Sequence, residues 1–178
     1  EATGRGIMII TKEILKKEKN LYFKSKINYL KCKFLREHEY YIWKFVTYLR
    51  REETSKNILI KYFWRRKKNK LGSKLGFTIY ANVFEEGLHI WHYGNIVVNG
   101  YAKVGKNCVL HGDNCIGNNG KDNGAPIIGD NVDIGVGAKI IGNVKIANNI
   151  KIGAGAVVIS SFEEEGITIG GVPARRLK

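Results

Sequence analysis

The chain has 178 residues, enough for one domain with a sizeable core or one domain with a helical appendage, but hardly for two separate cores. Its formal net charge of +14 lies entirely before residue 77: residues 1–76 hold 21 Lys and Arg against 7 Asp and Glu, whereas residues 77–178 hold 9 of each. The sequence shows no run of about 18 uncharged apolar residues and no secretory pattern, which argues against a membrane span and predicts a cytoplasmic protein.

The three cysteines, Cys32, Cys108 and Cys115, lack the CxxC spacing of metal knuckles and redox motifs. They are therefore predicted to be buried thiols rather than a disulfide framework or a metal site. Residues 1–7 precede Met8 and could be foreign to the natural chain, so they carry no weight in the fold prediction.

Between residues 11 and 70 the apolar residues recur at helical spacing, which predicts amphipathic helices. The clearest runs lie at 23–34, 42–49 and 55–70, and the last ends in the basic stretch WRRKKNK, which suits a helix C-terminus. The composition changes near Gly72–Gly76. We therefore predict a basic α-helical segment over residues 1–76 and a separate domain over residues 77–178.

From residue 98 the sequence has a period of six. Aliphatic residues occupy every sixth position from Val98 to Ile116 and again from Ile128 to Val158, and glycine often follows them. A hexapeptide period predicts a parallel β-helix, in which the aliphatic side chain points inward and glycine or asparagine beside each corner tolerates unusual backbone angles. Coils stacked about 4.8 Å apart pair as parallel strands and share one core.

The period is interrupted once, by the segment GNNGKDNGAP at 117–126, and resumes in phase at Ile128. A loop over residues 117–127 is therefore predicted to leave the coil and return without disturbing the stack. Loops on a rigid scaffold often carry binding residues, so this loop is a candidate for ligand contact.

These features resemble the hexapeptide-repeat acyltransferases, and among them the serine acetyltransferase-like branch. The resemblance covers residues 72–178 and rests on WHYGNIVV (91–98), the glycine-rich loop, IGVGAKIIGNVKI (134–146), IKIGAGAVVI (150–159) and GGVPAR (170–175). It implies a homotrimer that binds acetyl-CoA between neighbouring subunits and acetylates a hydroxyl group. The expected fold class is mainly β: a left-handed parallel β-helix preceded by an α-helical N-terminal segment.

His92 falls on the catalytic histidine of that family. The resemblance implies that it is the general base, taking the proton of the attacking hydroxyl, while backbone N–H groups stabilise the oxyanion. Counting back in sixes from Val98 places this imidazole inside the coil, so we expect the register to slip before Ile96. A structural histidine held by hydrogen bonds is the alternative.

The resemblance also implies which residues bind acetyl-CoA. Gly135–Val136–Gly137 and Gly153–Ala154–Gly155 fall on segments whose backbone pairs with the pantetheine arm, where side chains must be small. The cations expected near the phosphates are Lys121, Lys139 and Arg175. The remaining predicted contacts are Gly117, Asn118 and Pro173, and no metal is expected.

The sequence departs from the serine enzymes of the family at three places. Trp91 stands where they have an aspartate directly before the histidine, and Phe77 or Thr78 stands where a second aspartate orients the imidazole. Gly124–Ala125 replaces an arginine–histidine pair. Without an orienting aspartate the base needs another partner, for which Glu85 or Glu86 is a candidate.

Aromatic rings suit the apolar face of a sugar, and Trp91 and Tyr93 flank His92. We therefore interpret the sequence as a glycan O-acetyltransferase for bacterial surface polysaccharide, with the acceptor bound by Trp91, Tyr93, Glu85, Glu86 and His111. The basic front would then lie at the anionic inner face of the membrane, where each Lys or Arg contributes about 1 kcal/mol. Alternatively, these helices simply pack on the trimer, or join two trimers.

Three other functions stay open. A serine acetyltransferase of cysteine biosynthesis is the first alternative. A zinc hydratase on the same scaffold would use three histidines, for which His89, His92 and His111 are available, although the GVPAR ending favours acetyl-CoA. Nucleic-acid binding by the basic front would show a steep salt dependence, but nothing in the repeat supports it, and no nucleic-acid partner is predicted.

Overall fold

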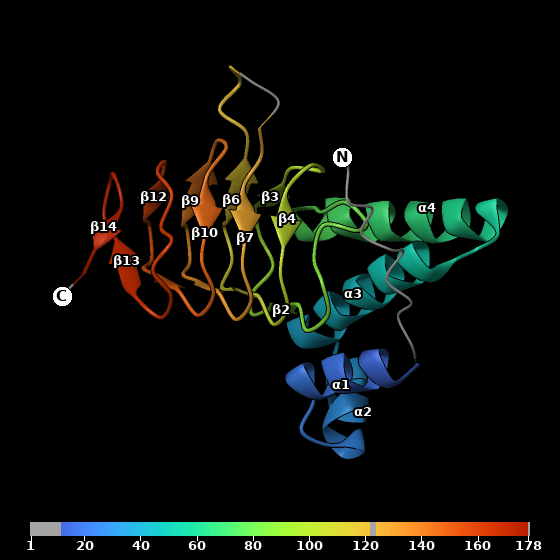
Figure 1. Ribbon diagram of the computed structural model, residues 1–178. Coiled ribbons are helices and arrows are strands. Elements are labelled where there is room, and N and C mark those ends of the chain that lie inside the picture. The colour runs from blue at the N-terminus through green and yellow to red at the C-terminus, as the bar shows by residue number, and fades with distance from the viewer. Residues whose placement is uncertain (1–11, 122–123, 178) are drawn as a thin grey trace.

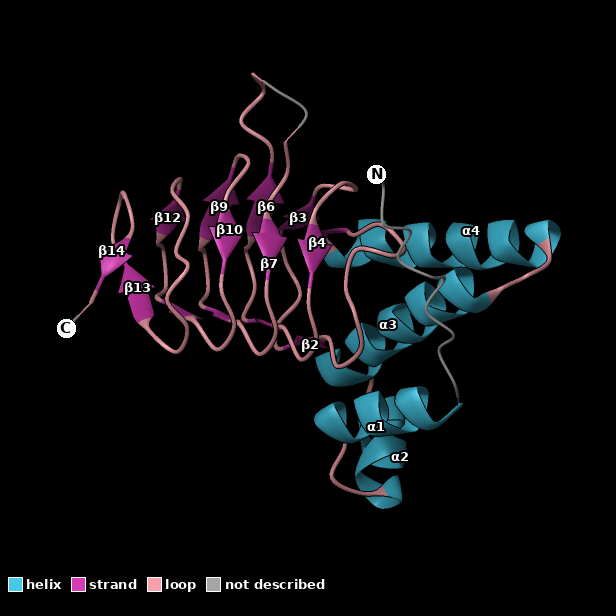
Figure 2. Cartoon of the chain, viewed as in Figure 1, coloured by secondary structure: helices cyan, strands magenta, loops and turns pink. Residues whose placement is uncertain are grey.

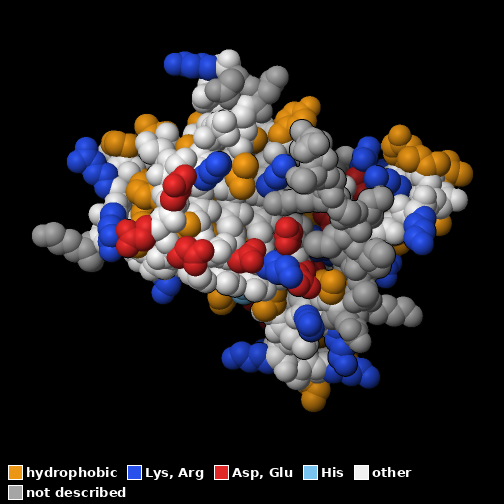
Figure 3. Space-filling model, viewed as in Figure 1, with side chains coloured by type: hydrophobic (Ala, Val, Ile, Leu, Met, Phe, Trp, Pro, Cys, Tyr) orange, Lys and Arg blue, Asp and Glu red, His pale blue; other side chains and the backbone are white. Residues whose placement is uncertain are grey.

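The computed structural model describes residues 12–121 and 124–177, so the segment 1–7 lies outside the described residues. Figure 1 shows a helical front at one end of a long stack of coils, and Figure 2 shows that the strands lie in that stack. Lys and Arg side chains gather over the helices, whereas the visible face of the stack mixes both signs of charge (Figure 3). None of the described helices is long and apolar enough to cross a bilayer.

The described front consists of helices α1 (Lys12–Tyr22), α2 (Lys26–Leu35), α3 (His38–Thr54) and α4 (Ile58–Leu75). Side chains cap two of them: Ser25 accepts from the backbone N–H of Asn28, and Asn57 accepts from two N–H groups at the start of α4. Helix α4 ends at Leu75 and is capped by Gly76, whose φ of 77° is the left-handed conformation that glycine adopts without strain. Strand β1 (Phe77–Thr78) begins directly after it.

The predicted apolar run over 23–34 begins in the turn between α1 and α2 and continues along α2. Phe23 is buried there, but Ile27, Leu30 and Phe34 are exposed. The apolar residues at the start of α4, Leu59 among them, are exposed as well. Helix α3 is the buried centre of the helical front: it contacts the other three helices, and its Ile42, Phe45, Val46 and Leu49 are almost fully buried.

Residues from Phe77 onward form a left-handed parallel β-helix with three faces, which confirms the predicted fold class. The first sheet contains β1, β3 (Ile96–Val98), β6 (Cys115–Gly117), β9 (Lys139–Ile141) and β12 (Val157–Val158). The second contains β4 (Lys103–Val104), β7 (Ile127–Ile128) and β10 (Lys145–Ile146). The third contains β2 (His89–Ile90), β5 (Val109–Leu110), β8 (Asp133–Ile134), β11 (Lys151–Ile152), β13 (Thr168–Gly170) and the antiparallel β14 (Arg175–Arg176).

The aliphatic positions of the hexapeptide repeat form the core of the coil. Val98, Val104, Leu110 and Ile116 are fully buried, and so are Ile134, Ile140 and Val158. Each coil contributes one aliphatic side chain per face, so neighbouring coils share a continuous apolar column. Cys108 is fully buried in this core and Cys32 is buried in the front, as predicted, but Cys115 is only half-buried.

The register of the first coil slips, as the sequence predicts. Ile90 pairs with Leu110, twenty residues further on, whereas Val98 pairs with Ile116, eighteen residues further on. The turn between Ile90 and Val98 therefore holds two more residues than the corresponding turn of the next coil. His92 lies in this longer turn and is exposed, not buried in the core.

The loop between β6 and β7 leaves the coil and returns without changing the pairing of the stack. Val104 pairs with Ile128, which in turn pairs with Ile146, so the stack continues across the interruption. Figure 1 shows the loop standing away from the coils.

A buried ion-pair network joins the helical front to the first coil. Arg50 on α3 is fully buried and lies 2.8 Å from the Glu18 carboxylate and 2.9 Å from the Glu53 carboxylate. It also donates to the backbone oxygens of Phe84 and Glu85. Burial alone would lower the pKa of Arg50, but the nearby Glu53 and Glu18 carboxylates raise it. Burial raises the pKa of Glu53, although the Arg50 charge opposes this shift. The ion pairs among Arg50, Glu18 and Glu53 therefore connect α1 and α3 to the backbone of the first coil.

The predicted unusual backbone angles occur at corner asparagines and at corner glycines such as Gly137 and Gly155, but not at the glycines that directly follow the aliphatic residues. Asn107, Asn131 and Asn149 have φ near +55 to +60°, the left-handed region. The glycines that follow the aliphatic residues, such as Gly135, do not have positive φ. They are small because the next coil passes close by: a Cβ at Gly135 would lie 2.7 Å from the backbone nitrogen of Ala154 and from the oxygen of Ile152.

This close approach gives a prediction for stability. Gly135→Ala is expected to lower the free energy of unfolding by about 1–3 kcal/mol, because the backbone of the next coil must move. Gly117→Ala is the matched control, since a Cβ there has its nearest neighbour at 3.6 Å. Urea unfolding of both variants measures the difference. Equal losses would contradict the close-packing explanation.

Candidate active site

The turns that link the third sheet to the first stack upon one another along one edge of the β-helix. We call this edge the His92 corner; it is formed by residues 91–95, 111–114, 135–138 and 153–156, and by residues 171–174, which link β13 to β14. His92 lies in its first turn, beside Gly112 in the second: a Cβ at Gly112 would be 3.5 Å from the Cβ of His92. The lack of a side chain at Gly112 leaves room next to the imidazole.

Backbone hydrogen bonds run from turn to turn along this corner. The N–H of Gly137 donates to the oxygen of Gly112 at 2.9 Å, and that of Gly155 donates to the oxygen of Val136 at 2.8 Å. Gly135–Val136–Gly137 and Gly153–Ala154–Gly155, both predicted acetyl-CoA segments, therefore lie in line with His92. The four glycines and Ala154 carry little or no side chain, and the Val136 side chain is exposed, so these turns form a strip along which an extended ligand with amide groups can lie.

The ring next to His92 comes from the helical front. His38, the first residue of α3, stacks on His92 with ring centroids 5.5 Å apart, and Tyr93 packs edge-on against His38. The proposed orienting carboxylates lie elsewhere: Glu86 pairs with Lys106 at 3.1 Å, and the backbone oxygen of Glu85 accepts from Arg50. Sequence reasoning missed His38, because nothing local indicates that the start of α3 reaches this turn.

Trp91 packs against two histidines of its own chain. Its ring stacks on His111 at 6.1 Å between centroids and contacts His89 at 4.6 Å. His111 Nε2 lies 2.8 Å from Asp133 Oδ1, an ion pair that forms if His111 is protonated. Burial, assisted by nearby His111, lowers the pKa of His89. This cluster lies on the outer face of the third sheet, where the Trp91 ring stays 48% exposed.

A carboxylate and an amine meet at the His92 corner where the sequence analysis expected only a cation. Asp113 directly follows Gly112 in the second turn and is exposed. The Lys139 amine donates to the backbone oxygen of Asp113 at 2.6 Å and lies 3.5 Å from its carboxylate. The other Asp113 oxygen is 3.9 Å from where a Cβ of Gly137 would be. A signal existed: Asp113 occupies the repeat position that holds Gly137 and Gly155 in the later turns.

The other predicted acetyl-CoA residues divide between a different corner and the last turn of this one. Gly117 is the last residue of β6, and Asn118 and Lys121 belong to the loop that follows it, at the far end of the first sheet's strands. Pro173 and Arg175 are exposed in and after the last turn of the His92 corner. A single chain therefore brings together His92 and the two small segments, and separates them from the loop.

The three histidines of the zinc alternative do not gather at one point in the chain. Trp91 packs against both His89 and His111, while His92 stacks on His38. Among the described residues, the group whose ligand atoms come close enough for a metal consists instead of Cys32, Glu37 and Glu39.

Comparisons with known proteins give one consistent result. A 92-residue stretch is 36% identical to a serine acetyltransferase of Synechococcus elongatus, and a 93-residue stretch is 38% identical to one of Staphylococcus aureus. Each stretch is 51% of this chain but only 37% or 43% of the relative, so the similarity spans less than half of these relatives. No family model matches the sequence.

Solved structures agree. The serine acetyltransferase of Neisseria gonorrhoeae aligns with a TM-score of 0.71 and 26% identity, over 93% of this chain and 66% of that chain. The same enzyme in complex with serine gives a TM-score of 0.70, also at 26% identity, over 93% of this chain and 68% of that chain. A soybean serine acetyltransferase aligns with a TM-score of 0.64 and 27% identity, over 78% of this chain and 57% of that chain.

The fold and these similarities group the repeat half with the hexapeptide-repeat acyltransferases. Within that class, the similar proteins are serine acetyltransferases, so the interpretation as a glycan O-acetyltransferase was wrong. That interpretation rested on Trp91 as a platform for a sugar; the ring packs against His89 and His111 but stays exposed, so it is the comparisons that overturn the interpretation.

Proposed function

We propose that the protein transfers the acetyl group of acetyl-CoA to the hydroxyl of L-serine, with His92 as the general base. The observation that carries the proposal is the position of His92 at the head of a strip of small turns, in a chain that aligns over 93% of its length with a serine acetyltransferase in complex with serine. This is the serine acetyltransferase alternative of the sequence analysis.

In the proposed reaction, the His92 imidazole takes the hydroxyl proton while the serine oxygen attacks the thioester carbon. A tetrahedral oxyanion forms and collapses, the carbon–sulfur bond breaks, and the proton returns from His92 to the leaving CoA thiolate. General-base assistance of this kind typically contributes about 10²–10⁴ in rate. Backbone N–H groups of the neighbouring turns are the donors within the chain that could stabilise the oxyanion.

Asp113 and Lys139 supply a reason why the acceptor is an amino acid despite the missing family residues. L-serine carries an ammonium and a carboxylate, and Asp113 and Lys139 present the two opposite charges side by side, one turn from His92. We assign Asp113 to the ammonium and Lys139 to the carboxylate of serine. This role for Lys139 replaces its predicted contact with the phosphates of CoA, a contact that its bond to Asp113 disfavours.

Acetyl-CoA is proposed to lie along the strip, with its pantetheine amides on the backbone of Gly135–Val136–Gly137 and Gly153–Ala154–Gly155. Lys121 and Arg175, both exposed, remain the proposed phosphate contacts. Because the loop that carries Lys121 stands at another corner, both sets of contacts can reach one ligand if the loop comes from a neighbouring subunit. We therefore propose a homotrimer. Attachment to the membrane surface stays a prediction.

Three acceptors that differ by one charged group test this assignment. CoA release from acetyl-CoA is measured with L-serine, with ethanolamine, which lacks the carboxylate, and with 3-hydroxypropanoate, which lacks the ammonium. L-serine is expected to have the highest kcat/KM, by about tenfold or more over each analogue, because each analogue leaves one charged side chain unmatched. Asp113→Asn should remove most of the preference over 3-hydroxypropanoate while retaining the preference over ethanolamine.

Equal rates for the three acceptors would contradict a charge-matched serine site. A preference for L-serine that Asp113→Asn leaves intact would keep the proposed reaction but reject the role of Asp113. The control for loss of one negative charge is Glu164→Gln. Glu164 is an exposed acid that pairs with Arg176 away from the His92 corner.

A further inference from the structure

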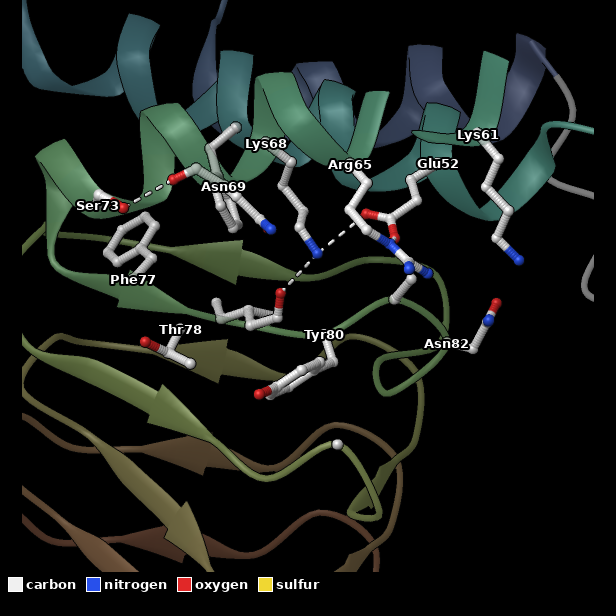
Figure 4. Close-up of a pocket in the computed structure, with 14 residues that line it drawn as sticks. Glu52, Lys61, Arg65, Lys68, Asn69, Ser73, Phe77, Thr78, Tyr80 and Asn82 are labelled. Atoms are coloured by element: carbon white, nitrogen blue, oxygen red, sulfur yellow. Dashed lines mark hydrogen bonds and ion pairs between the residues drawn. The ribbon is translucent and has the colours of Figure 1, made fainter. Parts of the chain in front are cut away.

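A groove of about 510 Å³ lies between helix α4 and the beginning of the first coil. Figure 4 shows α4 forming one wall, with β1 and the chain that follows it forming the other. None of its lining residues belongs to the His92 corner, so the groove is separate from the proposed acetyl-transfer site. Most of its lining side chains are polar or charged.

A buried ion pair, Lys68 with Glu52, forms the floor of this groove. Lys68 is only 4% exposed and donates to the backbone oxygen of Ile79 at 2.9 Å. Its amine also lies 3.0 Å from Oε2 of Glu52, an oxygen that makes no well-directed hydrogen bond. Glu52 itself is 1% exposed and accepts from Arg65 Nε at 2.7 Å through its other oxygen. Because a buried carboxylate is costly without a partner, Glu52 keeps its bond to Arg65, and this bond fixes the position of the Arg65 guanidinium.

The remaining donors meet at one end of the groove. Figure 4 shows the ends of Lys61, Arg65 and Asn82 pointing toward this end. Arg65 uses Nε for Glu52, which leaves its two terminal nitrogens for a ligand. Asn82 is held in place from behind, because its backbone N–H donates to the buried Glu53 carboxylate at 2.8 Å. Three donors of different kinds are thus arranged around one open position.

The groove lining carries more positive charge than its own carboxylate neutralises. Three cations, Lys61, Arg65 and Lys68, face one carboxylate, Glu52, which leaves a formal charge of +2. Tyr80 borders the same groove with an exposed ring. Gly100 lets that ring lie flat, since a Cβ there would be 3.3 Å from Tyr80 Cγ. The groove therefore offers a cationic end beside an aromatic wall.

We propose that this groove binds a small molecule carrying a phosphate group, with the phosphate held by Lys61, Arg65 and Asn82 and the rest of the molecule against Tyr80. A phosphate monoester carries about −1.5 to −2 charges at neutral pH, close to the unmatched charge of the lining, and its oxygens accept from several directions. A carboxylate would neutralise only half of that charge. The phosphate can belong to a soluble metabolite or to a lipid headgroup.

Titration calorimetry on the full chain tests the proposal with inorganic phosphate, phenyl phosphate and benzoate. Phenyl phosphate is expected to bind most tightly, and benzoate at least about tenfold more weakly. Lys61→Met should raise the Kd for phenyl phosphate by about tenfold, the usual effect of one charge-assisted contact. Lys70→Met, which removes the same charge from an exposed position of α4 outside the groove, should change it less than about twofold.

Equal weakening by Lys61→Met and Lys70→Met would show that anions follow only the overall basic charge, and would overturn the proposal. Absence of binding to all three probes and to vesicles containing phosphatidic acid would also overturn it. Vesicle binding that depends on Lys61, without affinity for the soluble probes, would identify a lipid headgroup as the source of the phosphate. None of these measurements involves acetyl transfer, so the result is independent of the proposed reaction.

Discussion

Replacing His92 with alanine is expected to lower kcat for serine acetylation by about 10²–10⁴, because the hydroxyl then has no base to take its proton. The free energy of unfolding should change little, since the His92 side chain is exposed and lies in a turn outside the apolar core. Acetyl-CoA affinity should also be retained, because the strip of small turns is unchanged. Steady-state kinetics, calorimetry and urea unfolding of the same preparation separate these effects.

His38→Ala is the matched control for this experiment. It removes the neighbouring imidazole, which stacks on His92 but is assigned no contact with the reacting atoms. We expect a loss of less than about tenfold, from poorer positioning of His92. If His92→Ala keeps most of its activity while His38→Ala or His111→Asn abolishes it, the assignment of the base is wrong.

Arg50→Met is expected to be the most destabilising substitution in the helical front. It removes the guanidinium between the buried carboxylates of Glu18 and Glu53 and leaves both without their main partner. Loss of one member of a buried ion pair typically costs about 3–5 kcal/mol. Urea unfolding at neutral pH should show a loss of this size.

Arg51→Met tests whether the position of the charge decides the effect. Arg51 is exposed and its guanidinium lies 4.5 Å from the Trp64 ring centre, a contact expected to contribute about 0.5–1 kcal/mol. Adding Glu18→Gln and Glu53→Gln to Arg50→Met should recover part of the lost stability, because the uncompensated charges disappear. A loss for Arg50→Met no larger than that for Arg51→Met would show that the network contributes nothing specific.

The sequence predicted those parts of the fold that repeat locally. A six-residue period leaves one solution, because each aliphatic side chain must point into a coil whose neighbours share its core, and the loop after Ile116 returns in phase with it. The glycine positions were predicted, but their cause was not: only the neighbouring coil shows that Gly135 is small because backbone atoms lie against it.

Contacts between distant segments could not be predicted from the pattern. Arg50 and its carboxylates are charged residues on helices, which normally face water, and only the packing of α1 and α3 against the first coil explains their burial. Likewise, Ile27 and Phe34 have the spacing of a buried face but are exposed in the single chain. At the site, the sequence shows only that Trp91 is next to His92. Its ring contacts with His89 and His111 depend on how successive coils align, which the pattern does not reveal.

The most direct test of the proposed function follows an isotopic label in the acetyl group of acetyl-CoA with the unmodified protein. L-serine and a panel of sugars are offered in the same mixture. The proposal predicts label on the serine oxygen, at a rate that exceeds that of the His92→Ala protein by two orders of magnitude or more. Label on a sugar but not on serine, or no label on serine while acetyl-CoA binds normally, would contradict it.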